Sequence, residues 1–207
     1  MGAMTFPLPR ARPHDAPSLA RRHALAMLAG AAFVPCASGR DAVESAAPFV
    51  ATPWSIVDEI LRLGEVGPAD FVVDLGSGDG RLVISAVTRY GARGGYGVDI
   101  DAALVRMANE SAVRAGVADR VRFDERDLFG ADVRAATVVT VYLLPKVMAR
   151  LERKLRAELR PGTRVVVNDY PFPTWTPERV VERDTLDKLA VSGMTFTQLF
   201  LYRVPAA

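Results

Sequence analysis

Apolar residues follow two alternating patterns along the central part of the chain. Short apolar runs, each of strand length, cover residues 71–75, 95–99, 121–123, 137–141 and 164–167. Between these runs, apolar residues recur every three or four positions, which predicts amphipathic helices over residues 80–90, 101–115 and 146–159. Strands that alternate with helices in this way predict a Rossmann-like, doubly wound α/β fold with a mostly parallel sheet.

Two helix starts can be located from their capping residues. Thr52 and Pro53 have the pattern of an N-cap followed by a first helical residue. Asp101 is expected to cap the helix over residues 101–115. The spacing of its apolar residues predicts that this helix turns inward Leu104, Val105, Ala108 and Val113.

The C-terminal tail predicts the remaining strands. Residues 180–204 have strand character and are interrupted at Ser192 and Gly193. We therefore expect a final antiparallel pair at the edge of the sheet. Added to the parallel strands, this pair makes a seven-stranded sheet the expected fold.

A glycine-rich turn follows the first strand. The strand ends in Asp74, and glycines then occupy alternate positions at Gly76, Gly78 and Gly80. Glycine admits positive φ angles and lets a ligand approach the backbone closely. The carboxyl end of a strand is also where open α/β sheets bind ligands. The second strand ends in Asp99, at the spacing where dinucleotide-binding folds place a carboxylate on a ribose.

The carboxylate at the turn narrows the choice of ligand. Asp74 would repel a pyrophosphate and favours a ligand with a positively charged end. S-adenosylmethionine fits this requirement, because it carries an ammonium, a sulfonium, a ribose and an adenine but no phosphate. A nicotinamide or flavin site, and a turn that binds nothing, remain as alternatives.

Through Asp74 to Gly80, the chain resembles the class I S-adenosylmethionine-dependent methyltransferases, which share a D-x-G-x-G-x-G turn. Residues 49–53 and 170–177 also look like the protein-lysine methyltransferases of the ATP synthase c subunit and the adenine nucleotide translocase, and like their bacterial relatives. This resemblance implies that residues 48–207 form a methyltransferase domain that N-methylates a lysine of a protein, with membrane proteins among the candidates.

The resemblance also implies roles for cofactor-binding residues. Asp99 is expected to bind the ribose, Asp127 the adenine amino group and Leu128 the adenine ring. Pairing of Asp127 with Arg122 or Arg126 is the alternative. The methionine end of the cofactor is assigned to Asp74, Gly76, Ser77, Gly78, Asp79 and Gly80.

Residues at the ends of later strands are candidates for the acceptor side. Asn168, Asp169 and Tyr170 follow the fifth parallel strand and are expected to orient an acceptor amine. A lysine amine must be neutral to react, and an apolar channel would lower its pKa. Candidates to line this channel are Thr52, Tyr142 and Trp175; for Tyr142 and Trp175, packing in the core is an equal alternative.

Composition and charge exclude other classes of function. The net charge is only +2, and basic residues are spread among acidic ones, so a nucleic-acid partner is not expected. Cys36, His14 and His23 are the only cysteine and histidines, so no metal site is expected. A small-molecule methyltransferase and a non-catalytic nucleoside-binding module remain as alternatives. The oligomeric state is not indicated.

Residues 1–47 have a different pattern. Residues 5–17 carry four prolines without periodicity, which predicts disorder. A signal-like or anchor segment is expected over about residues 20–39, where Arg21 and Arg22 precede a short apolar run. The run is too short to span a bilayer, although residues 20–36 could bind a membrane. Cofactor supply favours the cytoplasm or the cytoplasmic membrane face; export by a twin-arginine-like signal is the alternative.

Overall fold

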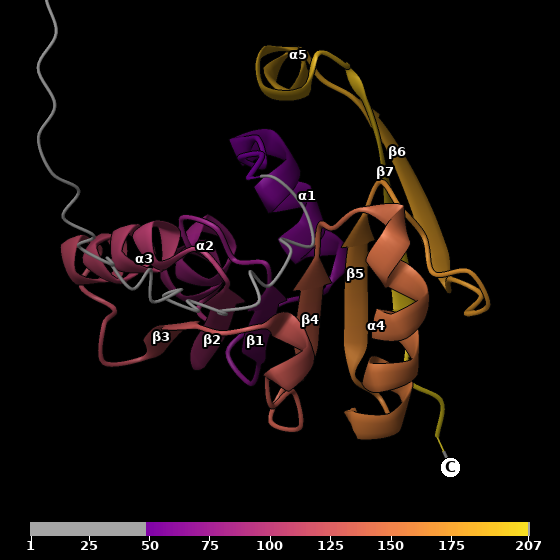
Figure 1. Cartoon of the computed structure of the whole chain (residues 1–207), viewed down its shortest axis with the longest axis horizontal. Helices are drawn as coiled ribbons and strands as arrows, with labels where there is room; N and C mark the ends of the chain where they lie inside the picture. The colour runs from indigo at the N-terminus through magenta and orange to yellow at the C-terminus, as the bar shows by residue number, and fades with distance from the viewer. Residues whose placement is uncertain (1–48, 207) are drawn as a thin grey trace, which may run out of the picture. The chain divides into compact units, whose positions relative to one another are not determined.

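A computed structural model of the chain describes residues 49–206, which form a mixed sheet with helices on both faces (Figure 1). The predicted signal-like segment and the domain boundary near residue 48 lie outside this range and stay predictions. Within the described range, no helix is long and apolar enough to cross a membrane.

The sheet has seven strands in the order β3-β2-β1-β4-β5-β7-β6. The parallel strands are β1 (Phe71–Leu75), β2 (Gly94–Asp99), β3 (Val121–Glu125), β4 (Val138–Val141) and β5 (Arg164–Asn168). The antiparallel edge pair is β6 (Arg179–Asp184) and β7 (Phe196–Arg203). The predicted fold class, including the C-terminal pair, is therefore confirmed.

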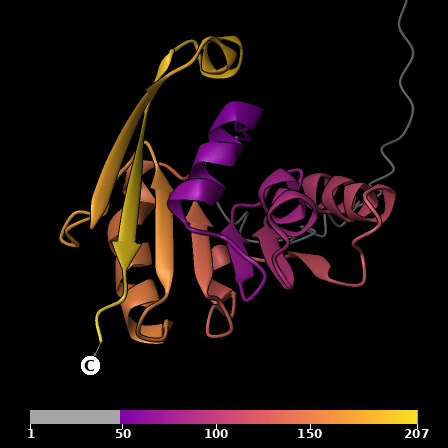
Figure 2. The ribbon, with the colours of Figure 1, turned by 180° about the vertical axis from the view of Figure 1, so that it is seen from behind.

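The helices divide between the two faces of the sheet. One face packs against α1 (Trp54–Leu63), α2 (Arg81–Tyr90) and α3 (Ala102–Arg114), which Figure 2 shows from behind. The other face packs against α4 (Pro145–Glu158). Successive strand residues point to opposite faces, so Val72 packs in the first core cluster and Val73 in the second. The central strands are buried on both sides for this reason.

Two details of the helices differ from the sequence prediction. The N-cap of α1 is Pro53, whose ψ of 146° keeps it extended, so Thr52 is not the cap. In α3, Val113 is exposed and Ala112 is buried in its place, because one residue along a helix turns the side chain by about 100°. Asp101 does cap α3, and its carboxylate accepts a hydrogen bond from the backbone N–H of Ala103.

A short helix that was not predicted, α5 (Leu186–Ser192), separates β6 from β7. Thr185 caps its start, and Gly193, with φ of 72°, ends it. Figures 1 and 2 show α5 at the tip of this pair, beyond the carboxyl end of β5. The hydroxyls of Thr185 and Ser55 lie 3.4 Å apart, so this tip lies beside the start of α1.

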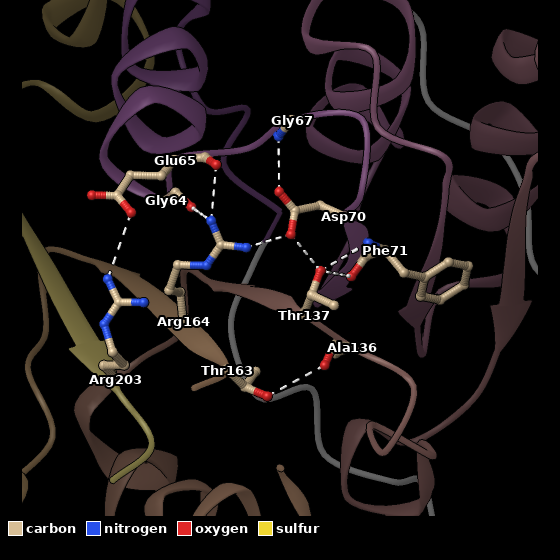
Figure 3. Close-up of polar contacts among 10 residues, drawn as sticks. All are labelled: Gly64, Glu65, Gly67, Asp70, Phe71, Ala136, Thr137, Thr163, Arg164 and Arg203. Carbon is tan, nitrogen blue, oxygen red and sulfur yellow. Dashed lines mark hydrogen bonds and ion pairs between the residues drawn. The ribbon is translucent and has the colours of Figure 1, made fainter. Parts of the chain in front are cut away.

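A polar network closes the opposite edge of the sheet, at the amino ends of β1 and β5 (Figure 3). Arg164 donates hydrogen bonds of 2.8 Å to the carbonyl oxygens of Gly64 and Glu65, and it forms an ion pair with Asp70. Asp70 also accepts a hydrogen bond from the Thr137 hydroxyl at 2.7 Å. The network thus joins the end of α1 to three strands, through side chains that are largely buried.

We predict that Arg164→Met lowers the free energy of unfolding by about 3 kcal/mol, because it leaves the buried Asp70 carboxylate and two carbonyls without a cation. Chemical denaturation followed by circular dichroism measures this loss. Arg134→Met is the matched control, since its ion pair with Asp132 is exposed, and it should leave the denaturation midpoint unchanged. Equal effects of the two variants would contradict the role of the network.

Candidate active site

A cavity of about 940 Å³ lies at the carboxyl ends of the parallel strands. Its lining includes the turn after β1, the ends of β2 and β4, and the loop after β3. Residues 49, 50 and 52, which precede α1, line it as well, and residues 49–53 are referred to below as the cover segment. The cavity therefore lies where the topology of an open α/β sheet predicts a ligand.

The glycine turn brings its backbone to the cavity. Gly76 and Gly78 line the cavity with φ angles of 86° and 52°, a region that glycine adopts without strain. A Cβ at Gly78 would lie 2.5 Å from the ring of Phe49, so only glycine allows the cover segment to approach this closely. Gly80, which was predicted to bind the cofactor, does not line the cavity and instead precedes α2.

Asp99 is held at the cavity by its neighbours. One carboxylate oxygen accepts the backbone N–H of Gly78 at 2.9 Å, and the other accepts that of Asp101 at 3.0 Å. Each carboxylate oxygen keeps a further lone pair for a ligand. Asp99 therefore fixes the glycine turn and can also accept hydrogen bonds from a pair of ribose hydroxyls.

Asp74 is a buried carboxylate at the same cavity. Its partner is the Thr140 hydroxyl on β4, which donates a hydrogen bond of 2.6 Å. Burial raises the pKa of Asp74 to about 7; the Thr140 bond opposes this shift, and the negative charges of Asp99 and Asp79 add to it. A ligand with a positive charge would stabilise the ionised form of Asp74.

Ser77 also fits a bound ligand. Its hydroxyl oxygen is buried at the cavity and has no hydrogen-bond partner among the described residues. A buried hydroxyl without a partner is costly, so a ligand that satisfies it gains affinity. With the Asp74 carboxylate and the open lone pairs of Asp99, the turn offers partners for the ammonium and ribose of S-adenosylmethionine.

Asp127 and Leu128 lie at the opposite side of the turn, after β3, and both line the cavity. Asp127 accepts the backbone N–H of Phe129 at 2.9 Å, which holds the loop in a turn. In the described chain Asp127 forms no ion pair with Arg126 or Arg122, and Arg122 pairs with Asp124 instead. The adenine-binding role predicted for Asp127 and Leu128 is thus compatible with their placement.

Arg81 joins the glycine turn to the cover segment. Its guanidinium forms an ion pair with Asp79, donates a hydrogen bond of 2.7 Å to the carbonyl oxygen of Thr52 and lies 4.9 Å from the ring centroid of Trp54. Thr52 lines the cavity, as predicted for a channel residue. Asp79, however, is engaged by Arg81, so its predicted contact with the cofactor must share the carboxylate.

The acceptor candidates separate into two groups. Tyr142 and Tyr170 line the cavity, whereas Asn168 and Asp169 do not. Asn168 is buried with its side-chain oxygen 2.7 Å from the Thr197 hydroxyl, and Asp169 forms an ion pair with Lys188. The structure therefore does not bring the three predicted acceptor residues together at the cavity surface.

Trp175 was predicted to line the channel, and the structure places it in the core instead. Its ring centroid lies 5.7 Å from that of Phe172 and 5.2 Å from that of Tyr202. The prolines around it prevent regular structure, and Thr174 binds the buried carboxylate of Glu152 on α4, which holds the loop down. The alternative interpretation, a loop anchored by a buried tryptophan, is the correct one.

Sequence reasoning missed several residues of the site. Thr140 is the hydroxyl partner of Asp74, and its signal was a lone polar residue in the buried run over residues 138–141. Arg81 follows the glycine turn directly and was not assigned a role. Lys188 is the buried partner of Asp169 and had no local signal, because it lies in a tail of strand-like composition.

A doubly wound sheet with an acidic residue before a glycine turn, and a second acid after β2, defines an S-adenosylmethionine-dependent methyltransferase. The family model for the ANTKMT methyltransferase domain matches residues 74–179. The chain belongs to this family and is an enzyme of the class, with S-adenosylmethionine as its cofactor.

Individual relatives agree with this assignment. A protein-lysine N-methyltransferase of Saccharolobus islandicus is 37% identical over 65% of this chain and 84% of its own length. The mouse adenine nucleotide translocase lysine N-methyltransferase is 40% identical over 67% of this chain, but the match spans only 59% of that protein. The crystal structure of a Salinibacter ruber RNA methyltransferase with S-adenosylhomocysteine has 43% identity and a TM-score of 0.68, covering 76% and 95% of the two chains.

We predict that affinity for S-adenosylhomocysteine rises by roughly 20-fold between pH 5.5 and 7.5 and then levels off. With a pKa of about 7, Asp74 is protonated in most free molecules at the lower pH and must lose that proton to pair with an ammonium. Isothermal titration calorimetry in two buffers of different ionisation enthalpy measures both the affinity and the released proton.

Thr140→Val is the matched variant for this pH dependence. It removes the hydrogen bond that lowers the pKa of Asp74, so the rise in affinity should move to higher pH. Asp74→Asn should abolish the rise. A wild-type affinity that is constant across this pH range would contradict the assignment of Asp74 to the ammonium.

We predict that Asp99→Asn weakens S-adenosylhomocysteine binding about tenfold, because a charge-assisted acceptor for the ribose hydroxyls is lost. Asp124→Asn is the control, since this carboxylate lies beside the Tyr96 hydroxyl at 3.2 Å and does not line the cavity. Calorimetric titration of the two variants decides the matter, and unchanged affinity in Asp99→Asn would remove Asp99 from the cofactor site.

Proposed function

We propose that the enzyme N-methylates the ε-amino group of a lysine in a protein. Among the described residues, all carboxylates that line the cavity belong to the side formed by β1, β2 and β3 and the segments that follow them: Asp74, Asp79, Asp99, Asp101 and Asp127. The residues contributed from β4 onward are aliphatic, aromatic, hydroxyl-bearing or cationic. This separation of charge across the cavity is the observation that carries the proposal.

The acidic side suits the cofactor, and the other side suits an uncharged amine. Leu143, Leu144 and Met194 form apolar walls, while Tyr142 and Tyr170 supply hydroxyls for hydrogen bonds. Burial between such groups lowers the pKa of an amine, because the charged form loses its hydration. The cations Lys146 and Arg150 line the same side and oppose an ammonium further. A lysine that enters from this side is therefore driven toward its neutral, reactive form.

Bound S-adenosylmethionine supplies a methyl group that its own sulfonium activates. The lysine nitrogen provides the electron pair of the new N–C bond, the C–S bond breaks, and the sulfur keeps the electrons of that bond. The protein must hold the nitrogen and the methyl carbon about 3–3.5 Å apart and in line. Tyr142 and Tyr170 are placed to orient the amine, and the cover segment keeps water away.

The names of the relatives support a protein acceptor. Relatives that match most or part of this chain are described as lysine N-methyltransferases of proteins in general, of the adenine nucleotide translocase and of the ATP synthase c subunit. The Salinibacter ruber neighbour is described as an RNA methyltransferase, which makes RNA the second candidate acceptor. Against RNA stand the net charge of +2 and the pairing of many described arginines with acidic residues. Cofactor supply favours action in the cytoplasm or at its membrane face.

The test is incubation of the purified full chain with radiolabelled S-adenosylmethionine and a membrane protein extract from the source cells. We expect label in a protease-sensitive, RNase-resistant band, and methyllysine after acid hydrolysis and mass spectrometry. Asp74→Ala is the inactive control, because it removes the carboxylate assigned to the ammonium. RNase-sensitive label, or label confined to small molecules, would overturn the proposal and support RNA or a metabolite as acceptor.

A further inference from the structure

A buried lysine on α5 forms an ion pair behind the acceptor side of the cavity. The side chain of Lys188 is only 3% exposed, and its Nζ lies 2.8 Å from each carboxylate oxygen of Asp169 and 2.6 Å from the carbonyl oxygen of Phe196. Every hydrogen of this ammonium can therefore be donated to an acceptor of the protein itself. Neither Lys188 nor Asp169 lines the cavity.

Asp169 occupies an unusual position in the backbone. Its φ of 64° is rare for a residue with a side chain and marks a conformation that the surroundings must enforce. Its backbone N–H donates to the carbonyl oxygen of Gln198, and its carboxylate lies 2.6 Å from the Thr197 hydroxyl. Contacts from β7 and α5 thus hold this carboxylate in one orientation.

Tyr142 connects this ion pair to the cavity. Burial, followed by the charge of Asp169 and a hydrogen bond to it, raises the pKa of the Tyr142 hydroxyl, which stays protonated and donates to Asp169. Tyr142 and Tyr170, the other titratable groups that act on one another and on Asp169 here, both line the cavity. The ion pair therefore lies behind a layer of phenols that an acceptor lysine would contact.

A carboxylate in this place would inhibit methyl transfer if it had no counter-ion. An opposite charge within about 4–6 Å raises the pKa of an amine by roughly 1–3 units, and the protonated amine has no lone pair to react. The negative charge at the end of β5 must therefore be cancelled before a lysine can react beside it.

We propose that Lys188 is a positioning residue for methyl transfer to lysine. Its ammonium cancels the charge of Asp169, so that Asp169 orients the Tyr142 hydroxyl without drawing the acceptor amine into an ion pair. The Tyr142 oxygen then keeps its lone pairs for an N–H of the neutral amine. This inference rests on the proposed function, since it concerns the protonation state of an acceptor lysine.

The test compares kcat from pH 6.5 to 9.5 for the wild type, Lys188→Met, Lys188→Arg and the double variant Lys188→Met/Asp169→Asn, with a lysine substrate and saturating S-adenosylmethionine. Lys188→Met should lower kcat at pH 7 about tenfold, which corresponds to a rise of about one unit in the pKa of the bound amine. Its kcat should approach the wild-type value at pH 9.5. Lys188→Arg and the double variant should keep the wild-type profile within about threefold, because both are neutral pairs.

Lys154→Met is the matched control. Lys154 is also a largely buried lysine with an ion pair, to Glu158 at 2.7 Å, but it lies on α4 and does not line the cavity. Its pH profile should not change. If Lys188→Met lowers kcat equally at every pH and the double variant does not restore it, Lys188 has only a structural role and the inference is wrong. The double variant, which leaves no unpaired charge, keeps this decision possible if Lys188→Met does not fold.

A second measurement does not depend on lysine methylation. Calorimetric titration of n-butylamine at pH 7, with saturating S-adenosylhomocysteine, should show about tenfold tighter binding to Lys188→Met than to the wild type, because the exposed charge of Asp169 attracts an ammonium. Equal affinities would overturn the inference even if the wild type methylates lysine. Tighter binding together with no transfer to any protein would support the role of Lys188 and reject the proposed function.

Discussion

A buried carboxylate in a cavity of its own negative neighbours is the constraint on which the rest of this structure depends. Asp74 ends β1 beside the glycine turn, its hydrogen bond comes from the neutral Thr140 hydroxyl, and the nearest charges named in its pKa shift are Asp99 and Asp79. Such a site disfavours phosphate and favours a cation. The same burial that makes ionised Asp74 costly in the free protein makes it a strong partner for an ammonium, so the choice of cofactor follows from one desolvated side chain.

The two edges of the sheet handle their polar groups in opposite ways. At the amino edge, Arg164 satisfies Asp70 and two carbonyls of the chain itself, and the network closes without a ligand (Figure 3). At the carboxyl edge, Asp74 lacks a cation and the Ser77 hydroxyl lacks a partner among the described residues. Stability and binding are therefore separated along the strands, and substitutions at the amino edge are expected to affect folding more than cofactor affinity.

The cofactor half of the site could be predicted from the sequence, and the acceptor half could not. The strand that ends in Asp74, the glycine turn and Asp99 are local patterns, because backbone geometry and the parallel order of neighbouring strands place them together. Thr52 failed as a cap because the extended Pro53 follows it, and Val113 failed because a helical face was misjudged by one residue. Trp175 could not be assigned to cavity or core until its contacts with Phe172 and Tyr202 were known.

By itself, the sequence determined the alternation of strands and helices, the turn that only glycines can form, and the acidic character of the cofactor side. These features depend on residues close together in the chain and on the periodicity of their burial. The tertiary structure decided that Thr140 meets Asp74 across 66 positions, that the cover segment closes over Gly78, and that Lys188 folds back onto Asp169. Such contacts follow from the register of adjacent strands and from the packing of a tail onto a finished sheet, which no local pattern encodes.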